Sequence, residues 1–185
     1  VLHSHITAAS VPGVGFQLKQ HQFAWAQERE IAGITWTFDP LVRRNCVFNF
    51  EKLGALAVEY LPNFYGTMTD AINAGDDSDR LFAYWPVQES LSNETTKTSA
   101  IALKNNAGAP ASQGFDNTKA FWVELPEDIE AMRKSDLELA RQWHKAVREV
   151  LQPALDDGCF ISTVNQDRTA ILVEPAMSDY EFPED

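Results

Sequence analysis

The sequence is short of basic residues and cysteines, and it has no long apolar run. Lys and Arg number 15 against 27 Asp and Glu, which gives a formal net charge of −12. A chain this acidic is poorly suited to bind a nucleic-acid backbone. Its 2 cysteines are too few for a disulfide framework, and no apolar stretch approaches the roughly 20 residues of a membrane span. We therefore expect a cytoplasmic protein that binds neither nucleic acid nor membranes.

Several common catalytic motifs are missing too. There is no Gly-x-Ser-x-Gly elbow, no Walker motif with its lysine and no zinc-ligand spacing. His3 and His5 would share one face of a strand, but a metal needs further ligands, so we predict no metal site. His5 could form the wall of a substrate cleft or act as a general base, a task that enzymes most often give to histidine. We expect His21 and His144 in helices, at the surface or at its boundary with the core, and Cys46 in the core.

A strand, a glycine turn and a helix follow one another at the start of the chain. An apolar run over residues 1–8 leads to Val11-Pro12-Gly13-Val14-Gly15, and a helical pattern begins at Phe16. The first N–H groups of a helix have no internal partners, and the helix dipole adds positive charge there. Glycine lets an anion approach such a backbone closely. The junction is interpreted as a phosphate cradle, with an ordinary tight turn as the alternative.

Further elements are predicted in the N-terminal half. The first helix should end at Gly33. Residues 34–38 alternate between apolar and polar side chains, as a half-buried strand does. Two more strands are expected at 56–60 and 79–87. A second helix is predicted over 42–53, with the inward positions Cys46, Val47, Phe50 and Leu53.

A long connection over residues 62–78 is rich in Gly, Asn and Asp. A loop of this length inside a compact domain is often functional. It carries Tyr65 and an acidic cluster that consists of Asp70, Asp76, Asp77 and Asp79. The cluster is either a solvated acidic loop or a rim that faces an amine substrate.

The C-terminal part is predicted to follow a polar linker. Residues 89–118 are rich in Asn, Ala, Gly and Ser, and only 101–103 could form a short strand. A β-α-α-β-β segment over 119–177 and an acidic tail over 178–185 come next. The elements of that segment are a strand at 121–125, a helix at 127–133, a helix that starts with the capping box Ser135-Asp136-Leu137-Glu138 and ends or kinks at Pro153, and strands at 160–164 and 170–173.

Several of these motifs together resemble the GNAT N-acetyltransferase superfamily. Gly13-Val14-Gly15 opens a helix, and a strand and then Asn45-Cys46 and Phe50-Glu51-Lys52-Leu53-Gly54-Ala55 follow it. A bacterial group of predicted acetyltransferases in that superfamily is more similar still. The residues that carry this second likeness are His3-Ser4-His5, Trp36-Thr37-Phe38-Asp39-Pro40-Leu41, Arg44-Asn45 and Tyr60-Leu61-Pro62-Asn63-Phe64-Tyr65-Gly66. The resemblance covers residues 1–86 well and 119–160 loosely.

The resemblance implies a mixed α+β fold of the GNAT acyl-CoA N-acyltransferase type, with residues 1–88 as the acyl-CoA-binding core. It implies acetyl-CoA or another acyl-CoA as co-substrate, a small-molecule amine as acceptor, and a homodimer as one possible assembly. The residues that it assigns to the co-substrate are Ile6, Thr7 and Ala8 for the pantetheine arm, Gly13, Val14, Gly15 and Phe16 for the pyrophosphate, and Asn45.

The chain departs from the family pattern in its first residues. Ser10 stands where the family usually has Arg or Gln, and Pro12 directly precedes Gly13. Because this loop is short for a pyrophosphate, we expect a few residues to be missing between Pro12 and Gly13. The half of the fold that should precede Val1 is absent as well. Either the C-terminal segment packs in its place, or the chain is incomplete, which we favour.

A further departure concerns the proton donor. Many family members have a tyrosine on the second helix that protonates the departing thiolate, and Phe50 occupies that position here. Tyr60 and Tyr65 are the nearest substitutes, with His5 as base toward the amine. Two function classes therefore stay open: an acyl-CoA-dependent N-acyltransferase, and a non-catalytic acyl-CoA-binding or scaffold module of the same fold.

Overall fold

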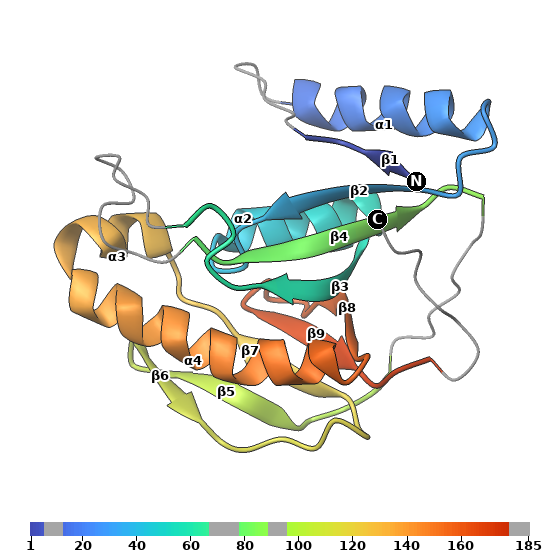
Figure 1. Ribbon diagram of the computed structural model, residues 1–185. Helices are drawn as coiled ribbons and strands as arrows, with labels where there is room; N and C mark the ends of the chain where they lie inside the picture. The colour runs from blue at the N-terminus through green and yellow to red at the C-terminus, as the bar shows by residue number, and fades with distance from the viewer. Residues whose placement is uncertain (6–12, 67–77, 89–95, 178–185) are drawn as a thin grey trace.

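One open sheet runs through the molecule, and helices pack against it (Figure 1). The computed structural model describes residues 1–5, 13–66, 78–88 and 96–177. Within these residues the sheet has 9 strands, in the order β1-β2-β4-β3-β8-β9-β7-β5-β6. The protein is of mixed α+β class, as the sequence predicts.

The first strand and helix lie at one edge of the sheet (Figure 1). β1 (Leu2–His3) pairs in parallel with β2 (Gly33–Phe38), and α1 (Val14–Gln27) connects them. The strand expected over residues 1–8 is confirmed at Leu2 and His3, while residues 6–12 lie outside the described part of the chain. α1 is held against the sheet by Phe23, whose ring centroid lies 4.7 Å from that of Trp85.

Two details of this edge differ from the sequence prediction. α1 does not reach Gly33, because Glu30 adopts a left-handed backbone with φ 54° and Ile31 donates its N–H back to the Ala26 carbonyl at 3.1 Å. Such a reversal closes a helix. β2 is buried along nearly its whole length rather than on one face. Its Thr35 is covered by His3, whose Nδ1 lies 3.1 Å from the threonine hydroxyl.

The second predicted helix forms, but its winding changes along its length. Arg43–Cys46 is α-helical (α2), and Val47–Leu53 continues as a π-helix (η1). The side chains confirmed as buried are Cys46, Phe50 and Leu53. Val47 is only partly buried, and Asn49 is buried instead. The wider π-helical turn bonds residues five apart and so shifts which side chains face inward, which an α-helical pattern cannot anticipate.

The strands predicted at 56–60 and 79–87 are confirmed as β3 (Leu56–Leu61) and β4 (Arg80–Pro86). β4 is central in this half of the sheet, with β2 and β3 antiparallel on its two sides. α2 and η1 pack behind these strands (Figure 1).

The predicted polar linker is wrong over much of its length. A hairpin of β5 (Ile101–Asn106) and β6 (Ala109–Ser112) forms the other edge of the sheet, with Asn105 opposite Pro110. Ala102 and Leu103 are buried. The hairpin is further attached by Trp143, whose indole N–H donates to the carbonyl of Gly108 at 2.8 Å. The polar residues of the β5–β6 hairpin lie on its exposed face and in its turn. Because they dominate the composition, the sequence does not reveal the apolar face that packs on the core.

The order β-α-α-β-β predicted for residues 119–177 is confirmed. The elements are β7 (Phe121–Glu124), α3 (Ile129–Ser135), α4 (Leu137–Asp156), β8 (Phe160–Val164) and β9 (Ala170–Glu174). The predicted capping box is wrong, because Ser135 still belongs to α3 and the Asp136 carboxylate caps α4 by accepting the Leu139 N–H at 3.0 Å. Pro153 does not end α4, which continues to Asp156.

The two halves of the chain share one sheet. β8 pairs with β3 at Ala57 and Ile161, and α4 packs against β3. The C-terminal strands therefore extend the sheet from β3, while β1 stays at the opposite edge. A common core of buried side chains spans both halves.

Candidate functional site

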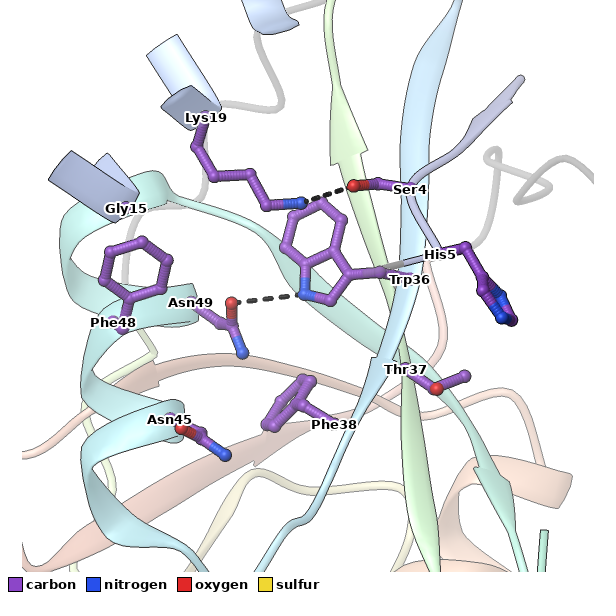
Figure 2. Close-up of a pocket in the computed structure, with 10 residues that line it drawn as sticks. All are labelled: Ser4, His5, Gly15, Lys19, Trp36, Thr37, Phe38, Asn45, Phe48 and Asn49. Atoms are coloured by element: carbon purple, nitrogen blue, oxygen red, sulfur yellow. Dashed lines mark hydrogen bonds between the residues drawn. The ribbon is translucent and has the colours of Figure 1, made fainter. Parts of the chain in front are cut away.

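A cavity of about 270 Å³ opens between β1, α1, β2 and the α2–η1 helix (Figure 2). Its described lining consists of Ser4, His5, Gly15, Lys19, Trp36, Thr37, Phe38, Asn45, Phe48 and Asn49. Three residues that the sequence assigns to the site line this cavity: His5 just after β1, Gly15 in α1 and Asn45 in α2. The His5 ring points away from Lys19 and Trp36 and lies beside His3 (Figure 2). We call this space the α1 cavity.

The N-terminus of α1 forms one side of the α1 cavity. Gly13 is the N-cap residue, with φ 85°, and no side chain among the described residues caps the helix. The first intrahelical bond runs from Gln17 N–H to the Gly13 carbonyl, so the preceding amides have no intrahelical acceptor. A Cβ added at Gly13 or Gly15 would meet no atom within 4 Å. The backbone here is open to an anion, as the phosphate-cradle interpretation requires.

Lys19 projects from α1 toward the opposite wall. It is 4% exposed, its Nζ lies 3.7 Å from the centre of the Trp36 ring, and it donates to Ser4 Oγ at 3.1 Å (Figure 2). Burial lowers the pKa of Lys19 to about 8. Sequence reasoning did not identify this residue. The available signal was its place between Phe16 and Phe23 at the i, i+3, i+7 positions of the apolar stripe.

Trp36 is fixed beneath the lysine by a second polar contact. Its indole N–H donates to Asn49 Oδ1 at 3.2 Å, and the amide nitrogen of Asn49 points away from the indole (Figure 2). Both side chains are buried. The π-helix therefore brings Asn49, rather than Val47, into contact with β2.

The charge of the α1 cavity contrasts with that of the whole molecule. The chain has a net charge of −12, yet no Asp or Glu occurs among the described lining residues, which include Lys19 and His5. With the open helix N-terminus, this environment favours a negatively charged ligand.

Neither candidate tyrosine lies at the α1 cavity. Tyr60 is 2% exposed, and its hydroxyl donates to Asp79 Oδ2 at 2.6 Å. Burial and the nearby carboxylate raise the pKa of Tyr60 well above its usual range. Tyr65 is 52% exposed, and the Arg80 guanidinium lies 4.9 Å from its ring centre. The tyrosine acid stays a prediction without geometric support. Phe50 packs inward, edge-on against Phe38, as expected.

Asp79 is the centre of a buried network that joins β3, β4 and α4. It accepts two hydrogen bonds from Arg148, at 2.8 and 2.6 Å, and one from the Asn63 N–H, while His144 Nε2 lies 3.4 Å away. Burial alone would raise the pKa of Asp79, but His144, Arg148 and Tyr60 together hold it well below its usual range. Asp79 is therefore not part of an exposed rim, and His144 is buried rather than at the surface or its boundary.

Other predicted residues lie outside the described part of the chain. They are Ile6, Thr7, Ala8, Ser10, Pro12, Asp70, Asp76 and Asp77. The expected gap between Pro12 and Gly13 is outside it as well. Val14 and Phe16 are present in the first turn of α1.

Membrane-spanning helices and similarity to known proteins are two further sources of information about function. No helix among the described residues has the length and hydropathy to cross a bilayer. Comparison with family models, curated proteins and solved structures gave no match to this chain. The α1 cavity is therefore the feature of the protein that bears on its function.

Proposed function

We propose that the protein is an acyl-CoA-dependent N-acyltransferase that transfers an acyl group, from acetyl-CoA or another acyl-CoA, to a small-molecule amine. The observation that carries this proposal is the α1 cavity, where the open N-terminus of α1 meets His5 and Asn45. It brings an anion-binding backbone close to the residue that carries a candidate base.

The amides at the start of α1 would hold the pyrophosphate. Gly13 and Gly15 leave room for it, and the helix dipole adds attraction. The α1 cavity is smaller than the roughly 300–1,000 Å³ of sites that enclose a whole drug-sized ligand. It would therefore hold only part of the co-substrate, and the adenosine end would lie outside.

His5 would serve as the base. Its exposed ring points away from Lys19 and Trp36 (Figure 2), with its centroid 6.1 Å from that of His3, so it would accept the proton of the attacking amine at the mouth of the cavity, through water. The bound co-substrate supplies the thioester carbonyl that the amine attacks. The acidic surface would attract a cationic acceptor toward the site.

Binding of CoA is the first test. We expect CoA and acetyl-CoA to raise the melting temperature and to give a saturable calorimetric isotherm. Gly15→Asp should weaken CoA binding at least about tenfold, because a carboxylate beside the phosphate site repels it. The same change should leave α1 intact, since acidic residues suit the first helical turn. Gly15→Asn is the neutral control. Flat isotherms for CoA and acetyl-CoA would overturn the proposal.

A non-catalytic acyl-CoA-binding module is the second candidate. Two observations favour it. Phe50 stands where many family members have the proton-donating tyrosine, and neither Tyr60 nor Tyr65 is among the residues that line the cavity. A thiol-release assay over a panel of amines separates the two, because a module binds CoA without turnover. In an enzyme, His5→Gln should lower kcat about a hundredfold. A similar fall in kcat for Tyr60→Phe or Tyr65→Phe would support the prediction that a tyrosine protonates the departing thiolate.

A further inference from the structure

Lys19 is a buried cation that no carboxylate of the described residues neutralises. It lines the α1 cavity, where its Nζ lies over the ring of Trp36 and donates to Ser4 Oγ. An ammonium group has three N–H donors, so these two contacts leave at least one for a ligand. A buried charge is costly unless it is paired. An anion bound in the α1 cavity would supply the missing negative charge.

Lys19 lies close to the amides at the start of α1. It follows Gly15 by one helical turn, which is about 5 Å along the axis. A long side chain on a helix leans toward the N-terminus and covers the turn that precedes its own Cα. For Lys19 this is the turn that begins at Gly15, and both residues line the same cavity. An anion on the free amides at the start of α1 is therefore within reach of the ammonium.

Asn49, on the opposite wall, gives an independent indication of a ligand. It is 3% exposed, and its Oδ1 accepts the indole N–H of Trp36. Its amide nitrogen is therefore turned away from the indole into the α1 cavity (Figure 2), where no described residue accepts a hydrogen bond from it. A buried N–H group without an acceptor is costly. Backbone amides, an ammonium and a side-chain amide thus all present donors to one space, and a ligand rich in oxygen atoms would satisfy them.

Among oxyanions, a diphosphate fits this arrangement of donors best. It carries oxygens on two phosphorus atoms, so one phosphate can accept from the amides at the start of α1 while the other pairs with Lys19. Both contacts are charge-assisted hydrogen bonds, and lysine is a common phosphate-binding residue. A cationic group would be repelled by the ammonium in a desolvated space.

We infer that the α1 cavity binds a diphosphate group, and that Lys19 is the charged residue that pairs with it. This inference deepens the proposed function, on which its application to CoA rests, because it names the part of the co-substrate that the cavity holds. Trp36 and Ser4 keep the ammonium in place. A nucleoside diphosphate has the same group, so ADP is tested beside CoA.

Calorimetry on the wild-type protein compares CoA, ADP, inorganic pyrophosphate and pantetheine. Pantetheine is the part of CoA without the diphosphate, so CoA should bind at least about tenfold more tightly than pantetheine. Inorganic pyrophosphate should bind and should compete with CoA. Equal affinities for CoA and pantetheine would overturn the inference.

Variants assign the binding to Lys19. Lys19→Met keeps the apolar stem and removes the charge, so the affinities for CoA and pyrophosphate should fall about tenfold to a hundredfold, while that for pantetheine stays the same. Lys145→Met is the matched control. It also removes one positive charge, but Lys145 is exposed on α4, so this variant should bind all four ligands as wild type does.

Proton uptake on binding is a second measurement, which needs no variant. Burial lowers the pKa of Lys19 to about 8, so at pH 9 the free protein carries it mostly neutral, and a bound diphosphate would raise this pKa. Calorimetry at pH 9 in two buffers of different ionisation enthalpy should therefore detect roughly one proton taken up per ligand. The ring of His5, the other titratable group of the described lining, points away from Lys19 (Figure 2). Zero uptake would overturn the inference even if Lys19→Met does not fold.

The outcomes distinguish this inference from the proposed function. If CoA does not bind but ADP and pyrophosphate bind and are weakened in Lys19→Met, the proposed function is wrong and the diphosphate site stands. If CoA binds equally well to wild type and Lys19→Met, this inference alone is wrong. Flat isotherms for all four ligands would overturn both.

Discussion

Lys19 links the chemistry of the site to the stability of the fold. Burial lowers its pKa to about 8, against an ordinary value of 10.5. Between these two pH values the unfolded chain holds a proton on Lys19 that the native state has released. Unfolding therefore takes up a proton, and the stability contributed by this residue rises with pH through that window and falls as pH drops through about 8.

Lys19→Met should remove this pH dependence. At pH 7 the variant is expected to be more stable relative to wild type than at high pH, because the cost of the buried charge is absent. The difference in free energy of unfolding should shrink by roughly 1–2 kcal/mol between pH 8 and pH 10.5, after allowance for partial screening by water. Urea unfolding of both proteins at several pH values measures it. Parallel stability curves would contradict the assignment.

Asp79 should be far more important for stability than a surface carboxylate. Asp79→Asn keeps the shape but leaves Arg148 and the Tyr60 hydroxyl without their charged partner, so we expect a loss of about 2–4 kcal/mol. Glu130→Gln is the control, because the pair of Glu130 with Arg44 is exposed and should matter by less than about 1 kcal/mol. Equal losses in urea unfolding would show that the buried network adds nothing.

The candidate site could be predicted in part from residue types. The sequence indicates Gly13-Val14-Gly15, His5 and Asn45, because glycines before a helix, histidines and residues of a family motif point to a function by their type and position alone. Lys19 was not, because a lysine inside an apolar stripe is usually exposed at its tip. Tyr60 was chosen as a proton donor, and only the three-dimensional structure shows that its hydroxyl is engaged by Asp79.

At the level of elements, a glycine in a helix and a glycine in a strand should respond oppositely to alanine. In α1, Gly15→Ala meets no neighbour, so it should stabilise by about 0.5–1 kcal/mol through helix propensity. In β2, a Cβ at Gly33 would lie 2.2 Å from Cε2 of Tyr84, so Gly33→Ala should destabilise by about 1–3 kcal/mol. Thermal unfolding compares them. A stable Gly33→Ala variant would mean that the ring moves at little cost.

The elements themselves differed in how well their sequences predict them. α4 and the strands of both halves follow strong periodic patterns, and they appear where expected. Apart from the short strand suggested at 101–103, the hairpin β5–β6 is not predicted, because its buried or half-buried positions are interspersed with Asn, Lys and Gly, which also mark loops. The π-helix was missed because its side-chain spacing has no simple periodic signature.

At the level of the whole molecule, the shared sheet predicts cooperative unfolding. Leu151→Ala in α4 removes a fully buried side chain and should cost about 2–5 kcal/mol. Because α4 packs on β3 and β3 is continuous with β4 and β2, hydrogen exchange should accelerate equally in β2, β4, β8 and β9. Leu18→Ala, at an exposed position of α1, is the control and should change protection little. Acceleration confined to β8 and β9 would mean that the halves open independently.

The hairpin at the far edge of the sheet limits how copies of the protein can associate. In a hairpin with a two-residue turn, the residues that flank the turn exchange hydrogen bonds, so the next residue of β6, Pro110, occupies a position whose N–H would point outward. Proline has no such donor. An incoming strand would find this edge interrupted. Growth of the sheet by strand addition is therefore disfavoured at β6, and two copies would have to meet elsewhere on the molecule.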